Sequence, residues 1–178
     1  MNIFILDEDP ILAAKYHADN NLNQKINDIL IILKNCRIIS KLETVPADLL
    51  MRIENTPILD WVLTSSGNYN WLYELLKALI EQLELRTNKP DAVSQELLEI
   101  LREVPEDIPD SGITCFPDLL PEAYQNNNIV EAHREYYIDT QLNKATWTDP
   151  AGVPAWIMAS VLPELKNTPI RITEISCF

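Results

Sequence analysis

The sequence predicts a single, mainly helical domain. Three Gly stand against twelve Pro in 178 residues, a composition that disfavours a turn-rich all-β design and favours helices separated by proline. Hydrophobic residues make up 47% of the chain, which is enough for one core at this length. We therefore expect residues 1–178 to form one compact helical domain, with a short N-terminal strand that can pair with a C-terminal strand.

The first element is a strand over Asn2 to Leu6, because this short apolar run precedes a clear helix start. Asp9 is the expected N-cap of that helix and Pro10 its first residue, and the helix continues through Tyr16. The acidic residues at positions 7 to 9 therefore lie at a strand-to-helix turn.

A second helix is predicted from Leu22 to Cys36, capped by Asp19 or Asn20. Its apolar residues fall on one stripe, and the residues expected to face water are Asn23, Lys25 and Asn27. Residues 37–56 are expected to be irregular apart from a short helix after Pro46.

The central part of the chain is expected to hold the longest helix. Thr56 and Pro57 repeat the cap-and-proline start before an apolar segment that Gly67 interrupts. A long amphipathic helix then runs from Asn68, its predicted cap, to about Leu85.

The C-terminal half alternates helices with a proline-rich connector. A helix is expected over residues 91–103, and "EVPEDIPDSGITCFPDLLPEAY" is a connector that covers a surface. A capped helix follows within "NNNIVEAHREYYIDTQLNKATW", then a helix in "PAWIMASVLPEL". The alternation in "IRITEISCF" predicts the C-terminal strand.

Charge and cysteine content restrict the classes of function. The formal net charge is −13, from 27 acidic against 14 basic residues, which disfavours non-specific DNA binding. Three widely spaced Cys without a CxxC motif predict free thiols and a cytoplasmic protein. No apolar run approaches membrane-spanning length, so no membrane partner is expected.

A first group of candidate site residues lies around the first helix. Carboxylates with an imidazole are the groups that a hydrolytic site needs, and they are close in sequence here: Asp7, Asp9, His17 and Asp19. Helix capping accounts equally well for Asp9 and Asp19, and a structural histidine for His17.

A second group combines aromatic residues with an arginine, a combination that can stack a base or hold a phosphate. Its members are Tyr69, Trp71, Arg134 and Tyr137. Packing of the rings in the core is the alternative interpretation. The sequence has no GxSxG, P-loop, HExxH or EF-hand pattern, and we expect neither a metal nor a cofactor.

Several stretches together resemble a phage and bacterial family described as pyrimidine-dimer DNA glycosylase-like. They are "MNIFILDEDPILAAKYHADNN", "TPILDWVLTSSGNYNWLYELLKAL", "CFPDLLPEAY" and "VEAHREYY", followed by Trp147 and "PAW". The resemblance covers residues 1–156 and leaves 157–178 as a C-terminal extension. It implies an action on DNA or nucleobases, with the first group as catalytic residues and the second as substrate contacts.

For an enzyme, the resemblance implies a DNA glycosylase/lyase-like hydrolase, which needs an amine nucleophile and a carboxylate. The α-amine of Met1 and the carboxylate of Asp7 or Glu8 are the candidates. The family carries a Cys-Asp-Lys-His run where this chain has Ala18, Asp19, Asn20 and Asn21. The resemblance therefore implies a diverged member, in which catalysis is left open.

A non-catalytic interaction protein is the second hypothesis. In it, an acidic phage-type protein binds and inhibits a basic host protein, as a DNA mimic or an anti-defence factor. The expected docking face is a run of acids, Glu96, Glu99, Glu103, Glu106, Asp107 and Asp110. A solvated helix face explains the same run.

Overall fold

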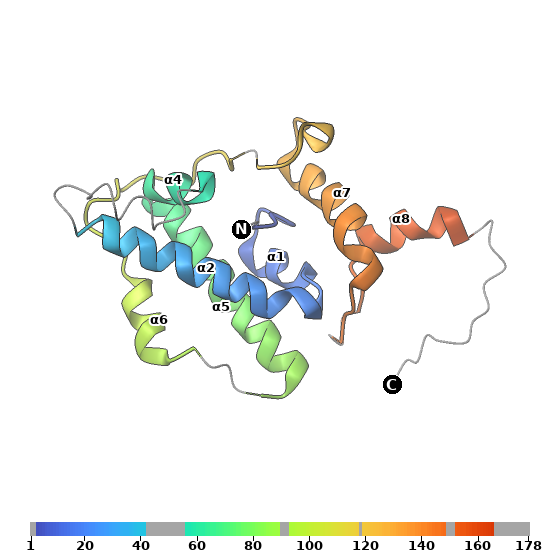
Figure 1. Cartoon of the computed structure of the whole chain (residues 1–178), viewed down its shortest axis with the longest axis horizontal. Helices are drawn as coiled ribbons and strands as arrows, with labels where there is room; N and C mark the ends of the chain where they lie inside the picture. Colours follow the sequence, from blue (N-terminus) through green and yellow to red (C-terminus); the bar gives the residue numbers. More distant parts are fainter. Residues whose placement is uncertain (1–2, 42–55, 90–92, 118, 149–151, 166–178) are drawn as a thin grey trace.

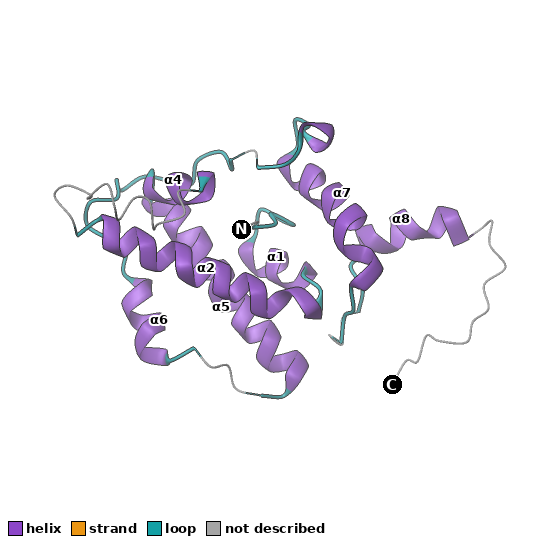
Figure 2. Cartoon of the chain, viewed as in Figure 1, coloured by secondary structure: helices purple, strands orange, loops and turns teal. Residues whose placement is uncertain are grey.

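The computed structural model describes residues 3–41, 56–89, 93–117, 119–148 and 152–165 of the 178-residue chain. Within these ranges the chain forms helices and loops, without a strand (Figure 2). The prediction of a mainly helical protein is therefore confirmed. The predicted strand at "IRITEISCF" and the helix after Pro46 lie outside the described residues.

The helices follow the predicted order closely. Their bounds are α1 Pro10–Tyr16, α2 Asp19–Ile39, α4 Pro57–Leu63, α5 Ser66–Thr87, α6 Gln95–Arg102, α7 Ile129–Gln141 and α8 Ala155–Leu165, with 3-10 turns η1 Glu122–Tyr124 and η2 Leu142–Lys144. In the part of the chain that is described, no helix is both long and apolar enough to cross a membrane.

Helix α5 is the centre of the packing. It makes its most extensive contacts with α1 and α2, and it also contacts α4 and α6. Its Tyr69, Leu72 and Leu76 are fully buried in the main core, together with Leu22 and Leu33 from α2. Burial of these side chains removes apolar surface from water, which is the dominant favourable term in folding.

The start of α5 differs from the prediction. Asn68 was predicted as the cap and Gly67 as an interruption, but the cap is Ser65 and Gly67 lies in the first turn. The reason is tertiary: the connector supplies carbonyls for the first N–H groups, with Ser66 N donating to Pro109 O at 2.9 Å. These are donors that a helix cannot satisfy internally.

The N-terminal segment is buried, and no strand is seen at Ile3 to Leu6; the partner predicted for it lies outside the described residues. Side chains of α7 bind its backbone: Ile5 N donates to His133 Nδ1 at 3.3 Å, and Arg134 Nε donates to Leu6 O at 2.8 Å. Figure 1 shows the segment between α1 and α7. It forms a second apolar cluster of Phe4, Leu6, Ala18 and Tyr137, against which Trp156 of α8 packs.

Candidate functional site

The acidic turn before α1 serves two structural purposes. Asp9 caps the helix as predicted, with its Oδ1 accepting from Ile11 N at 2.8 Å and Leu12 N at 3.3 Å. Asp7 accepts from Asp9 N at 3.1 Å and from Arg134 Nη2 at 2.9 Å. The fold thus joins Asp7 and Arg134, one residue from each predicted group, in a partly exposed ion pair.

Arg134 is held by aromatic rings as well as by Asp7. Its guanidinium carbon lies 5.4 Å from the ring centroids of both Tyr16 and Trp156. Such cation–π contacts add to the ion pair and to the hydrogen bond with Leu6 O. Arg134 therefore ties the N-terminal segment, α1, α7 and α8 together.

His17 and Tyr137, from different predicted groups, lie side by side in the second cluster with ring centroids 6.0 Å apart. His17 Nδ1 donates to Ala13 O at 2.7 Å, and complete burial lowers the pKa of His17 to about 4. Tyr137 Oη accepts from Ala18 N and from Asn21 Nδ2, each at 2.8 Å. The histidine is neutral at pH 7 and both groups stabilise the corner between α1 and α2.

Asp19 does not cap α2, contrary to the prediction; nor does Asn20. The N-cap is Ala18, which makes no side-chain cap bond. Asp19 instead binds the buried Arg86 at 3.0 Å and accepts from Thr148 N at 3.0 Å. Arg86 also donates to His17 O at 2.7 Å, so this pair closes the same corner.

Lys25 was predicted to face water, but only 5% of it is exposed. Its Nζ lies 3.3 Å from Asp28 Oδ2 and 5.0 Å from the Phe4 ring centroid. Burial is the main cause that lowers the pKa of Lys25. The helical spacing does not predict the burial of Lys25, because the N-terminal segment that covers this side chain contacts it only in the folded chain.

The predicted substrate contacts Tyr69 and Trp71 are both buried in the main core, where Trp71 is 6% exposed. Tyr69 is fully buried in the main core, where its hydroxyl donates to Leu101 O at 2.8 Å. Trp71 donates from Nε1 to Glu8 O at 2.7 Å. Its ring centroid is 4.8 Å from that of Phe116.

Trp71 lies at a pocket of about 760 Å³. The described residues that line this pocket come from the acidic turn, α5, the connector, the turn before α7 and the start of α7; they are Glu8, Trp71, Ile113, Thr114, Cys115, Phe116, Asn126, Asn127 and Ile129. We call it the Trp71 pocket. It combines aromatic and aliphatic walls with a few polar groups, which is typical of small-molecule sites.

The connector wall of the Trp71 pocket is fixed to the start of α5. Asn68 Oδ1 accepts from Thr114 N at 2.8 Å, and Asn68 Nδ2 donates to Thr114 Oγ1 at 2.8 Å. Ser65 Oγ donates to Ser111 O at 2.9 Å. Gly67 leaves no room for a Cβ beside the backbone of Ile113. The wall is thereby preorganised although it belongs to a loop.

The electrostatics of the Trp71 pocket are simple. Among its described lining residues Glu8 is the one charged group, and no Lys or Arg is present. The described residues provide no ion pair or hydrogen bond to the Glu8 carboxylate. Asn126 Oδ1 accepts from Asn128 N at 2.7 Å, so the amide nitrogen is the group that Asn126 can offer to a ligand.

Sequence reasoning identified Trp71 but missed Phe116, Asn126 and Asn127. A signal was present: a connector of this length without regular structure is uncommon in a compact domain and is often functional. From its sequence the connector is interpreted as the cover of a surface, because its attachment to α5 depends on contacts between residues that are distant in sequence.

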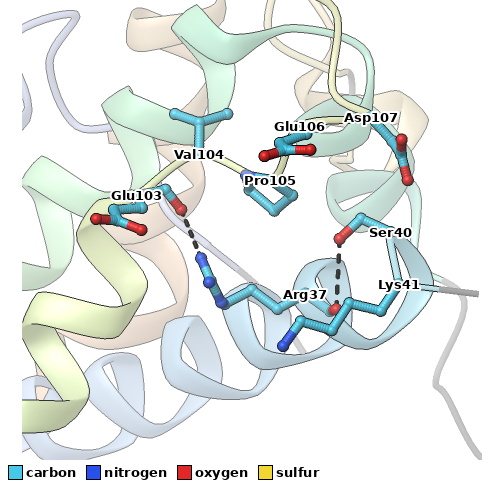
Figure 3. A pocket seen from close by; sticks show the side chains of 8 residues that line it. All are labelled: Arg37, Ser40, Lys41, Glu103, Val104, Pro105, Glu106 and Asp107. Atoms are coloured by element: carbon cyan, nitrogen blue, oxygen red, sulfur yellow. Dashed lines mark hydrogen bonds between the residues drawn. The ribbon is translucent and has the colours of Figure 1, made fainter.

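The acidic residues proposed as a docking face are all exposed, on α6 and the connector. Three of them, Glu103, Glu106 and Asp107, line a second pocket of about 400 Å³ together with Arg37 and Lys41. Figure 3 shows Arg37 reaching across this pocket, where it donates to Glu103 O at 2.6 Å. Acids outnumber cations there, so the pocket does not favour an anion.

No group of three His, Cys, Asp or Glu side chains in the described ranges is placed to hold a metal ion together. Comparison of the chain with models of known protein families, with curated proteins and with solved structures found no match. The family resemblance stays a prediction.

Proposed function

We propose that this chain binds a nucleobase in the Trp71 pocket, as a diverged, cytoplasmic member of the pyrimidine-dimer DNA glycosylase-like kind. One observation carries the proposal. Glu8, from the acidic turn, and Trp71, from the predicted base contacts, are 63 residues apart in sequence and line the same pocket. If the chain is encoded by a phage, the host cytoplasm is the place of action.

The chemistry of the pocket suits a planar, hydrogen-bonding ligand. Aromatic faces stack on bases, an interaction worth about 1–3 kcal/mol per base. The partly exposed Phe116 supplies such a ring, backed by the buried Trp71, while Asn126, Asn127 and Glu8 supply amide and carboxylate groups for the edges of a base. A pocket of about 760 Å³ is within the usual range for small-molecule sites.

The proposal concerns binding and includes no catalytic step. Each predicted catalytic residue holds a structural hydrogen bond: Asp9 to α1, His17 to Ala13, Asp7 to Arg134 and Asp19 to Arg86. We therefore expect no base release from a duplex that carries one thymine dimer. Release by the wild type, absent from the Asp7→Ala/His17→Ala double variant, would show instead that the chain is a glycosylase.

Cys115 offers a direct test of binding, because it is exposed and lines the pocket. A Cys177→Ser background removes the thiol that lies outside the described residues. Cys36 is buried, and burial raises the pKa of its thiol to about 12, so Cys115 should be the reactive group. We expect nucleosides to slow the alkylation of Cys115, followed by mass spectrometry.

The matched variants are Phe116→Leu, which removes an aromatic face of the pocket, and Tyr124→Leu, which changes a ring on η1 outside the lining. Protection of Cys115 should be lost in the first variant and kept in the second. If no nucleoside slows alkylation of the wild type, the proposed function is wrong.

The exposed acids favour a second candidate function, docking on a basic protein surface. All six predicted residues, Glu96, Glu99, Glu103, Glu106, Asp107 and Asp110, present carboxylates to solvent. Complementary charge accelerates association and makes it sensitive to salt. Binding of a host protein at low salt should then be lost in the triple variant Glu103→Lys, Glu106→Lys and Asp107→Lys. It should be kept in a control variant that reverses three acids elsewhere, Asp60, Glu81 and Glu122.

A further inference from the structure

We propose that the Trp71 pocket selects phosphate-free nucleosides whose base carries an exocyclic amino group, so that cytidine binds better than uridine or cytidine monophosphate. This inference rests on the proposed function and specifies its ligand. It decides between DNA and free nucleosides, which the sequence alone leaves open.

The first argument concerns charge. Glu8 is the one charged residue among the described lining residues, and the chain as a whole carries a formal charge of −13. A phosphate near the pocket would meet a negative local group and a negative overall field, and the described lining offers no Lys or Arg to offset them. A nucleic-acid backbone needs such cations for its affinity.

The second argument concerns hydrogen bonding. An ionised carboxylate accepts hydrogen bonds and cannot donate them. The amino group of cytosine donates, whereas the equivalent O4 of uracil accepts and would oppose the Glu8 carboxylate. The ring nitrogen and O2 of cytosine can accept from an amide nitrogen, which Asn126 can supply because its Oδ1 is bound to Asn128 N.

The third argument concerns preorganisation. The backbone oxygen of Glu8 accepts from Trp71 Nε1 at 2.7 Å, so the backbone that carries the Glu8 carboxylate is attached to the aromatic wall of the pocket. Phe116 lies against both Trp71 and Trp61, with ring centroids 4.8 and 5.1 Å apart respectively. A fixed aromatic wall with the Glu8 backbone attached to it can discriminate between bases with little backbone entropy to lose.

The test measures dissociation constants of cytidine, uridine and cytidine 5′-monophosphate by calorimetry at low salt. For the wild-type protein we expect cytidine to bind roughly tenfold more tightly than either competitor, the scale of one charge-assisted hydrogen bond. In Glu8→Gln the amide can donate to O4 of uracil. The preference for cytidine over uridine should then disappear or reverse, and the discrimination against phosphate should weaken.

The control is Glu81→Gln, which removes the same charge from an exposed position of α5 about 15 Å along the helix from Trp71. It should bind like the wild type. Equal affinities for cytidine and uridine, or the same preference in Glu8→Gln as in the wild type, would overturn this inference while nucleoside binding itself stands. Absence of binding by all three ligands would instead reject the proposed function, and the inference with it.

Discussion

Gly67 packs directly on the backbone of Ile113, so that the first turn of α5 and the wall of the Trp71 pocket share one contact surface with no space for a side chain. In the same turn, Gly67 N donates to Ser111 O at 3.0 Å. A helix start and a pocket wall are therefore a single structural unit. Substitutions at the helix start should therefore alter the wall of the Trp71 pocket.

Gly67→Ala is the most direct test of this unit. Alanine favours a helix over glycine by about 1 kcal/mol, but the added Cβ would meet the connector backbone, which cannot rotate away. We expect net destabilisation of roughly 1–3 kcal/mol in urea unfolding, together with faster alkylation of Cys115 as the wall moves. Gly112→Ala is the control, because a Cβ there has no described atom within 4 Å and should change stability little.

Arg86→Ala tests the corner between α1 and α2. The side chain is 1% exposed and donates to Asp19, to His17 O and to Lys15 O, so its removal leaves buried acceptors without donors. Acceptors left without donors cost about 1–3 kcal/mol, and more where the acceptor is charged, measured as the free energy of unfolding. Arg102→Ala removes the partner of Glu99 in a pair that is about two-thirds exposed and should cost under about 1 kcal/mol. Similar losses in both variants would contradict this account of the corner.

The buried His17 should make stability depend on acid pH. Burial lowers its pKa from 6.5 to about 4, so the unfolded chain takes up its proton first as the pH falls. The contribution of neutral His17 to the free energy of unfolding, about 3 kcal/mol, is fully present above pH 6.5 and is lost as the pH falls toward 4. Urea unfolding at pH 7 and pH 4.5 should show a smaller difference for His17→Gln than for the wild type. An equal difference would place the acid sensitivity in other groups.

Tyr137→Phe isolates a single hydroxyl in the second cluster. Its oxygen accepts from Ala18 N and Asn21 Nδ2, and neither donor has access to bulk water. We expect a loss of about 1–3 kcal/mol in thermal or urea unfolding, the cost of buried donors without acceptors. Tyr124→Phe, which removes a hydroxyl bonded to Asp139 at the surface, should be nearly neutral.

The sequence predicted well those features that depend on neighbouring residues. Asp9 with Pro10, and Thr56 with Pro57, begin α1 and α4 as expected, because capping and proline act within one turn. The apolar stripe of α5 is buried as expected, since helical spacing determines which residues share a face.

The errors arise where distant parts of the chain provide the hydrogen bonds. At the start of α5, carbonyls of the connector accept from the first N–H groups, where Asn68 is the predicted cap. At α2, Asp19 is the predicted cap, but its carboxylate pairs with Arg86. Ile5 N donates to a side chain of α7, in a segment predicted as a strand. The Trp71 pocket could not be predicted for the same reason. Glu8 and Phe116 are far apart in sequence, and each contacts Trp71 only in the folded chain.

The most direct measurement is a titration of the 15N-labelled protein with cytidine, observed through the indole N–H signals of its four Trp. The signal of Trp71, assigned with Trp71→Phe, should shift with increasing ligand together with the amide of Thr114, whereas the indole signal of Trp147, outside the pocket lining, should stay in place. Shifts confined to α6 and its acidic residues, or no shift at any cytidine concentration, would contradict a nucleobase site in the Trp71 pocket.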